Sequence, residues 1–150
     1  MAIVLPKFSS RRLPQRRSVA VRTEPAVGIR LLNLQPALEP NEELEFEYRI
    51  ERVAPELIDR LEISIAWKTE GKGSEDLGVH FFRSATQEEL GADVLASGQR
   101  LSARMPLTPL SYEGRLFKIR WCIRLRLFLN DGREIATEQP FYLGNLTTEV

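Results

Sequence analysis

Apolar and polar residues alternate along most of this chain, beginning near residue 26. In residues 43–51, every second side chain is apolar and the intervening ones are glutamate or arginine. Successive side chains of a β-strand point to opposite faces of a sheet, so this pattern predicts a strand with one face on a core and one in water. Similar runs occupy residues 27–31, 61–67, 101–105, 117–129 and 135–141, and residues 77–82 predict a short strand that is more apolar overall.

The longest run, residues 117–129, predicts one unbroken strand of about 45 Å, at about 3.3 Å per residue. The segment 130–132, Asn-Asp-Gly, follows it and predicts a hairpin turn, because these residues tolerate positive φ. A short helix could begin at residues 87–90, but Gly91 would keep it brief. About seven alternating runs separated by turns therefore predict an all-β fold, an antiparallel immunoglobulin-like β-sandwich of about seven or more strands.

The segment 105–114, Met-Pro-Leu-Thr-Pro-Leu-Ser-Tyr-Glu-Gly, resembles a known family. It is similar to the L-P-x-x-P-P-S-x-x-G segment that precedes a long strand in arrestin-like amino-terminal domains. Residues 139–141, Gln-Pro-Phe, resemble the closing P-F strand of that family. Residues 39–44 resemble its turn into a strand, with Asn41 at a left-handed position where the family usually has glycine.

This resemblance covers about residues 26–144 and implies an arrestin-like sandwich that acts as an adaptor or scaffold. Arrestins place two sandwiches in tandem around a charged core, whereas 150 residues supply length for one. The phosphate sensing of visual and β-arrestins is therefore not implied here. The Pro-Pro-x-Tyr ligand of the α-arrestins is also missing, since residues 109–112 read Pro-Leu-Ser-Tyr.

The composition excludes several classes of site. The chain has one Cys and one His, so an intrachain disulfide, a Cys-cluster metal site and a multi-His metal site are impossible. We expect no catalytic residues, no cofactor and no metal. Cys122 lies at an outward-facing position of its strand, where we expect an unpaired thiol in a reducing, cytoplasmic compartment. No apolar run reaches the roughly 18–20 residues of a membrane-spanning helix.

The single histidine, His80, leaves one enzymatic alternative open. A catalytic histidine needs a positioned nucleophile and an orienting acid. Ser74, Asp76 and Ser84 are near in sequence, but neighbours on a strand project to opposite faces. We therefore predict a protein that is not an enzyme, with a small ligand-binding or hydrolytic sandwich using His80 as the alternative.

The zero net charge, from 21 basic and 21 acidic residues, conceals an uneven distribution. Residues 1–22 contain six basic and no acidic residues, so the remainder holds 15 basic and 21 acidic ones. We predict a basic, flexible arm over 1–24, a sandwich over 25–145 and a tail over 146–150. A second alternative is tethering to nucleic acid or anionic lipid, and only through this arm. Its candidate residues are Arg11, Arg12, Arg16 and Arg17.

A row of cations on the outward face of the longest run is the other candidate for binding a partner or an anion. It consists of Lys118, Arg120, Arg124 and Arg126. The alternative that we favour is pairing with acids on neighbouring strands, at roughly 0.2–1 kcal/mol per pair. The candidate acids are Glu134, Glu138, Glu43, Glu45 and Glu47. The predicted function is a protein-interaction module that binds an unidentified protein, or a second copy of itself, through an exposed strand edge.

Overall fold

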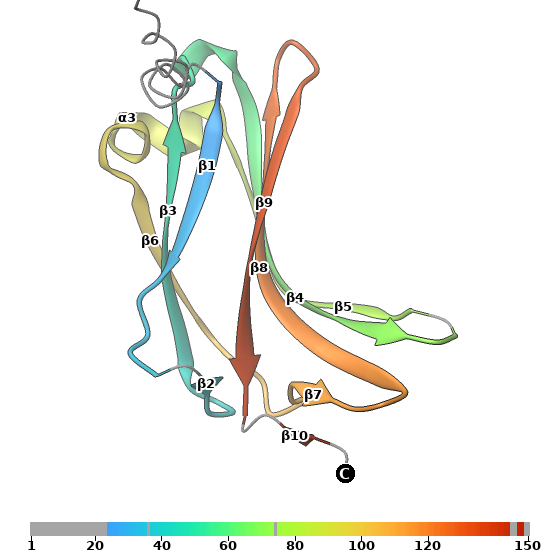
Figure 1. Cartoon of the computed structure of the whole chain (residues 1–150). Coiled ribbons are helices and arrows are strands. Elements are labelled where there is room, and N and C mark those ends of the chain that lie inside the picture. The colour runs from blue at the N-terminus through green and yellow to red at the C-terminus, as the bar shows by residue number, and fades with distance from the viewer. Residues whose placement is uncertain (1–23, 36, 74, 145–146, 149–150) are drawn as a thin grey trace, which may run out of the picture.

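Two sheets packed face to face form the structure, a computed structural model that describes residues 24–35, 37–73, 75–144 and 147–148 (Figure 1). The smaller sheet has the strand order β1-β3-β6, all antiparallel. Its strands are β1 (Ala26–Leu31), β3 (Glu43–Glu51) and β6 (Gln99–Arg104). The predicted sandwich is therefore confirmed, whereas the predicted basic arm lies outside the described residues.

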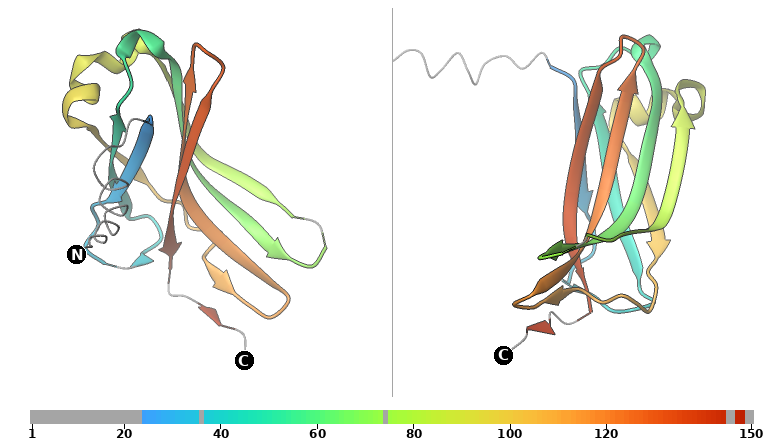
Figure 2. Two further views of the ribbon diagram at one scale, coloured as in Figure 1. Left: turned by 45° about the horizontal axis from the view of Figure 1, so that its top comes forward. Right: turned by 90° about the vertical axis from the view of Figure 1, so that its right-hand side faces the viewer.

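The larger sheet has the order β10-β7-β8-β4-β5, with β9 on β8 and β2 on β9. Its long strands are β4 (Ile58–Gly71), β5 (Leu77–Thr86), β8 (Phe117–Leu129) and β9 (Glu134–Leu143). Its two-residue strands are β2 (Ala37–Leu38), β7 (Tyr112–Glu113) and β10 (Thr147–Thr148). The long strands pair antiparallel, while β2 and β10 each add a short parallel pairing. Figure 2 shows β9, β8, β4 and β5 side by side in that order.

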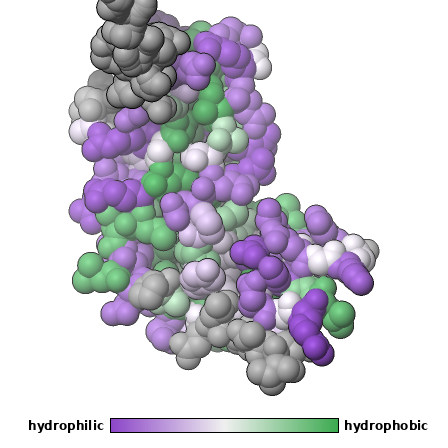
Figure 3. Space-filling view, viewed as in Figure 1, coloured by the Kyte–Doolittle hydropathy of each residue, from purple (hydrophilic) through white to green (hydrophobic). Residues whose placement is uncertain are grey.

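The core lies between the apolar faces of the two sheets, as the alternation predicts. The largest fully buried side chains are Trp121, Phe46, Leu38, Leu44, Ile58, Leu61, Ile63, Ile65, Met105, Ile123, Leu125 and Leu127. Each such side chain contributes about 1.5–3 kcal/mol relative to an exposed one. Hydrophilic side chains cover most of the face seen in Figure 3, and hydrophobic ones gather in smaller patches such as the seam between β1 and β9.

The described residues also contain two short helical segments, η2 (Pro55–Leu57) before β4 and α3 (Gln87–Ser97) between β5 and β6. The helix α3 begins at the predicted residue, and Gly91 interrupts it with φ of 75°. Leu90 anchors α3 to the core with 7% of its surface exposed. The connection from β5 to β6 passes from the larger sheet to the smaller one, so α3 covers one end of the sandwich (Figure 1).

The proline-containing segment 105–114 is bound to the two strands that follow it. The indole Nε1 of Trp121 donates a hydrogen bond of 2.8 Å to the carbonyl of Pro109. Ser111 is 2% exposed, and its Oγ accepts a hydrogen bond of 2.9 Å from the Leu143 amide. The Ser111 amide in turn donates to the Leu143 carbonyl at 2.9 Å. The segment that resembles arrestins thus joins β8 to the end of β9.

The two predicted turns are confirmed by their backbone conformation. Asn41 has φ of 70°, the left-handed conformation expected from its place in the turn that resembles the arrestin-like one. Gly132 has φ of 94° in the turn between β8 and β9, and its amide donates to the carbonyl of Leu129. The turn at Gly132 joins the antiparallel strands β8 and β9, whereas the turn at Asn41 leads from β2 of the larger sheet into β3 of the smaller one.

The structure departs from the sequence prediction in β5. The predicted run 77–82 is longer, Leu77–Thr86, and contains a bulge. Ile65 faces Phe81 but Ala66 faces Val79, so His80 has no partner position on β4. An extra residue reverses the alternation. Consequently Val79 lies on the outer face below the bulge, and Phe82 lies on that same face above it.

A second departure concerns the start of β8. Phe117 falls on the same alternate positions of β8 as the core residues such as Trp121 and Ile123, yet 43% of its surface is exposed. The lower parts of β4, β5 and β8 bend away from the smaller sheet, so this end of the inner face has no sheet opposite it (Figure 1). Phe117 packs instead on Tyr112 of β7, with ring centroids 5.0 Å apart. Trp67, also expected in the core, is half-buried over Gly78, where a Cβ atom would overlap the indole.

We expect Ser111→Ala to destabilise the fold by about 1–3 kcal/mol, because it leaves the buried Leu143 amide without its acceptor. Urea denaturation of the full chain measures this loss. Ser102→Ala, at an exposed position of β6, is the matched control and should change the free energy of unfolding by less than about 0.5 kcal/mol. Equal effects of the two substitutions would contradict the role assigned to Ser111.

Candidate functional site

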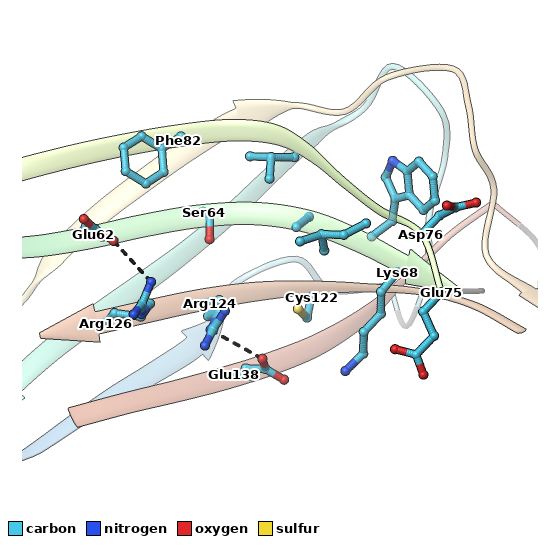
Figure 4. Close-up of a pocket in the computed structure, with 14 residues that line it drawn as sticks. Glu62, Ser64, Lys68, Glu75, Asp76, Phe82, Cys122, Arg124, Arg126 and Glu138 are labelled. Atoms are coloured by element: carbon cyan, nitrogen blue, oxygen red, sulfur yellow. Dashed lines mark ion pairs between the residues drawn. The ribbon is translucent and has the colours of Figure 1, made fainter. Parts of the chain in front are cut away.

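A groove of about 480 Å³ lies on the outer face of the larger sheet, where the bend makes that face concave (Figure 4). Its floor is a row of small uncharged residues. Ala66 of β4 lies opposite Cys122 of β8 and opposite Val79 of β5. The row continues to β9, where Pro140 lies opposite Cys122. An apolar band therefore crosses four strands between charged residues above and below it.

The β5 side of the groove is apolar and open to solvent. Leu77, Val79 and Phe82 are exposed by 69%, 57% and 57%, and all three line the groove. Isolated exposed apolar residues are ordinary on a surface, whereas a contiguous group beside a concave floor marks an interaction site. This wall therefore carries the strongest signal for binding on the described surface.

The opposite side of the groove carries ion pairs between β8 and its two neighbours. Arg126 lies between Glu134 of β9, at 2.7 Å, and Glu62 of β4, at 3.6 Å. Arg124 lies 3.6 Å from Glu138, and its Nε is buried without a hydrogen-bond partner among the described residues (Figure 4). At the edge of the groove, the Nε of Arg124 thus faces the Glu138 carboxylate just beyond hydrogen-bonding distance.

These contacts shift two groups in the expected directions. The hydrogen bond from Arg126 lowers the pKa of Glu134, and the attraction of neighbouring arginines adds to this effect. Burial raises the pKa of the Cys122 thiol, and the nearby Glu138 carboxylate raises it further. Cys122 is unpaired, as predicted, and is held in its less reactive thiol form on the groove floor.

The predicted cation row is divided by the bend of the sheet. Arg124 and Arg126 line the groove, whereas Lys118 and Arg120 lie beyond it. Lys118 pairs with Glu113 at 3.0 Å, and Arg120 pairs with Glu70 at 2.9 Å. All four cations therefore have carboxylate partners. A role for them in binding an anion or partner stays a prediction, and Arg11, Arg12, Arg16 and Arg17 lie outside the described residues.

The acids of β3 are not among those partners, because β3 belongs to the other sheet. Glu43, Glu45 and Glu47 form ion pairs with arginines of the smaller sheet. Those arginines are Arg104, Arg100 and Arg30. Of the acids predicted to face the β8 cations, the structure places Glu134 and Glu138 there. The proposed pairing of β8 with Glu43, Glu45 and Glu47 is therefore wrong.

His80, the residue of the enzymatic alternative, occupies the bulge of β5. Its Nε2–H donates a hydrogen bond of 2.8 Å to the backbone carbonyl of Arg104 on β6. Its ring meets Trp121 edge-on, with centroids 6.2 Å apart. These contacts connect the edges of the two sheets and supply neither a nucleophile nor an acid. Within the described part of the chain, no cluster of three or more His, Cys, Asp or Glu is arranged to hold a metal.

The groove itself was missed by sequence reasoning. Its apolar wall depends on the bulge, which puts Val79 and Phe82 on one face although their spacing is odd. The sequence signal that could have indicated it is the row of uncharged residues, Ala66 and Cys122, at outward positions of two otherwise charged strands. Recognising that these residues are adjacent requires the register of β4 against β8.

The architecture is that of the arrestin-like β-sandwich. A solved structure with this fold is Spo0M, a sporulation control protein from Bacillus subtilis, which superimposes with a TM-score of 0.55 at 11% sequence identity. The similarity covers 81% of this chain and 49% of Spo0M, so the chain spans about half the length of that protein. Neither the protein-family models nor the curated protein sequences give a match. No helix in the described residues has the length and apolar character needed to cross a bilayer.

We expect the Arg126–Glu134 pair to make stability depend on pH. Because the pKa of Glu134 is lowered in the folded chain, its contribution is present above the ordinary glutamate pKa of about 4.3 and is lost as the pH falls through the folded value. Arg126→Gln should reduce the drop in thermal midpoint between pH 7 and pH 3. Lys72→Gln, in the β4–β5 loop, is the control and should behave as wild type. Parallel pH profiles for all three proteins would refute this.

We expect the rate at which iodoacetamide alkylates Cys122 at pH 8 to be about tenfold lower in the folded chain than in the urea-unfolded chain. The reason is that burial raises the pKa of the thiol and restricts access to it. Mass spectrometry of the alkylated chain over time gives both rates. Equal rates in the folded and unfolded chains would contradict the placement of Cys122 on the groove floor.

Proposed function

We propose that this chain is a non-enzymatic protein-interaction module, an adaptor or scaffold, that binds a partner in the groove of the larger sheet. The observation that carries the proposal is the exposed apolar wall of Leu77, Val79 and Phe82 beside an uncharged floor. Apolar area of this kind supplies binding free energy when a partner covers it.

The chemistry of the groove indicates the kind of partner segment that fits. A short segment with apolar side chains would cover the β5 wall of Leu77, Val79 and Phe82. The rim contains both charges, with Lys68, Arg124 and Arg126 facing Glu62 and Glu138. Such a balanced rim favours a segment of mixed polarity over a strongly anionic ligand.

The likeness to a regulatory protein and the arrestin-like motif support a binding role. Spo0M is described as a sporulation control protein, and we carry over a regulatory binding role as part of this proposal. We also propose that the chain is a single-sandwich relative of the arrestins. The segment 105–114 supports this, because its Pro109 accepts a hydrogen bond from Trp121 of β8 and its Ser111 accepts one from Leu143 of β9.

Filling the groove tests this proposal. Ser64 lies at its centre, between Arg124 and Phe82 in register, and Ser64→Trp should block a partner segment. The matched control, Ser102→Trp, puts the same side chain on the outer face of the other sheet. Slower alkylation of Cys122 in Ser64→Trp, with an unchanged thermal midpoint, verifies that the indole occupies the groove of a folded chain.

Quantitative mass spectrometry of proteins co-isolated with the tagged full chain from its native cells is the readout. We expect proteins enriched by wild type to fall by about tenfold or more with Ser64→Trp, as expected when a central contact is blocked, and to be retained by Ser102→Trp. Enrichment that is equal for both variants, or no enrichment by wild type, would refute the groove as a protein-binding site.

A further inference from the structure

The strand β5 forms an edge of the larger sheet. All of its ten residues except His80 pair with β4 on one side, and no strand of the described chain pairs with its other side. The backbone N–H and C=O groups along such an edge can pair with another strand. Folded proteins commonly protect long edges with charged side chains, prolines or covering segments.

Two other edges in the described chain, β6 and β9, carry such protection. The outward side chains of β6 include Arg100 and Arg104, and the Arg104 carbonyl already accepts a hydrogen bond from His80. The far side of β9 receives β2 and contains Pro140, which has no N–H to donate. The outer row of β5 instead begins with Leu77, Val79 and Phe82.

The sequence of β5 is self-complementary when two copies are placed antiparallel. The bulge leaves His80 out of the row of paired residues along β5. One paired residue, Phe81, therefore lies between Val79 and Phe82, just as Gly78 lies between Leu77 and Val79. A two-fold axis at Val79 therefore sets Leu77 of one copy opposite Phe82 of the other. The same register sets Gly78 opposite Phe81, so each pair consists of residues on the same face of the sheet.

The next pair in this register joins opposite charges, Asp76 of one copy and Arg83 of the other. Neither side chain forms an ion pair with another described residue of its own chain, and the guanidinium of Arg83 lies 5.8 Å from the Phe81 ring centroid. Asp76 lies opposite Thr69, whose amide donates a hydrogen bond of 3.0 Å to the Asp76 carbonyl, and Thr69 belongs to the inward row of β4 with Trp67. The Asp76 side chain also borders one end of the groove (Figure 4). Asp76 thus has the same inward parity as Arg83 in the register.

We propose that two copies of this chain form a two-fold dimer by antiparallel pairing of their β5 edges, with Val79 at the axis. The larger sheets of the two copies then become one continuous sheet, and the apolar walls of the two grooves meet at the axis. This goes beyond the proposed function, because the groove of a single chain requires no dimer. The partner is a second copy because β5 supplies both the apolar pairs and the opposite charges of this register.

Charge reversal at the Asp76–Arg83 pair tests the dimer. Asp76→Arg or Arg83→Asp alone puts like charges at two symmetric positions, and each should raise the dimer dissociation constant by about thirtyfold in sedimentation velocity. The double variant, Asp76→Arg with Arg83→Asp, restores opposite charges and should return to within about threefold of wild type. Single variants that dimerise as wild type, or a double variant as weak as the single ones, would overturn the proposal.

Cysteine cross-linking tests the register itself in a Cys122→Ser background. Val79→Cys should form a disulfide-linked dimer on mild oxidation, because directly opposed residues of an antiparallel pair lie within disulfide distance. Leu77→Cys and Phe82→Cys should cross-link with each other in a mixture. The control is Lys72→Cys, in the loop outside the strand, which should not cross-link.

The two proposals fail in distinguishable ways. A chain that is monomeric at all concentrations up to about 1 mM, a value typical of the weakest specific affinities, overturns the dimer and leaves partner loss by Ser64→Trp intact. Conversely, if Ser64→Trp keeps its partners as Ser102→Trp does, the groove is refuted, whereas the charge-reversal and cross-linking results still decide the dimer. Cross-linking of Lys72→Cys as fast as Val79→Cys would also overturn the proposed register.

Discussion

The antiparallel pairing of β4 with β8 is the constraint on which the rest of the structure depends. The two strands remain paired from Ile58 opposite Leu129 to Gly71 opposite Phe117, which is nearly their full length. Their inner rows supply much of the core, including Leu61, Ile63 and Ile65 with their partners on β8. A shift of this register by one residue would place charged side chains in the core, so burial fixes how β4 and β8 pair.

The bend of this strand pair produces the groove. Where β4 and β8 turn away from the smaller sheet, the inner face loses its covering and the outer face becomes concave (Figure 1). At the bend β8 also changes partner, from β9 beside Trp121 to β7 beside Ile119. Small residues at outward positions, such as Ala66 and Cys122, leave room on the concave side. The core and the candidate site thus arise from the two faces of one strand pair.

The sequence was sufficient for the strands but not for the site. Alternation identifies β3 and β8 because each strand carries its own pattern of buried and exposed residues, and local turn chemistry identifies Asn41 and Gly132. The groove depends on which strands are neighbours, which is a non-local property. The bulge at His80 also breaks the alternation in β5, so the apolar residues that line the groove read there as part of a short, apolar strand.

The ion pairs of the outer face explain why the binding signal lies on β5 and not on the row of cations. Arg126 has a carboxylate on each neighbouring strand, and Arg124, Arg120 and Lys118 each have at least one. Exposed pairs of this kind contribute about 0–1 kcal/mol each, enough to favour one register but little toward total stability. A ligand anion would have to displace a carboxylate that is already in place. The apolar side chains of β5 have no such competitor, and covering them releases water at no electrostatic cost.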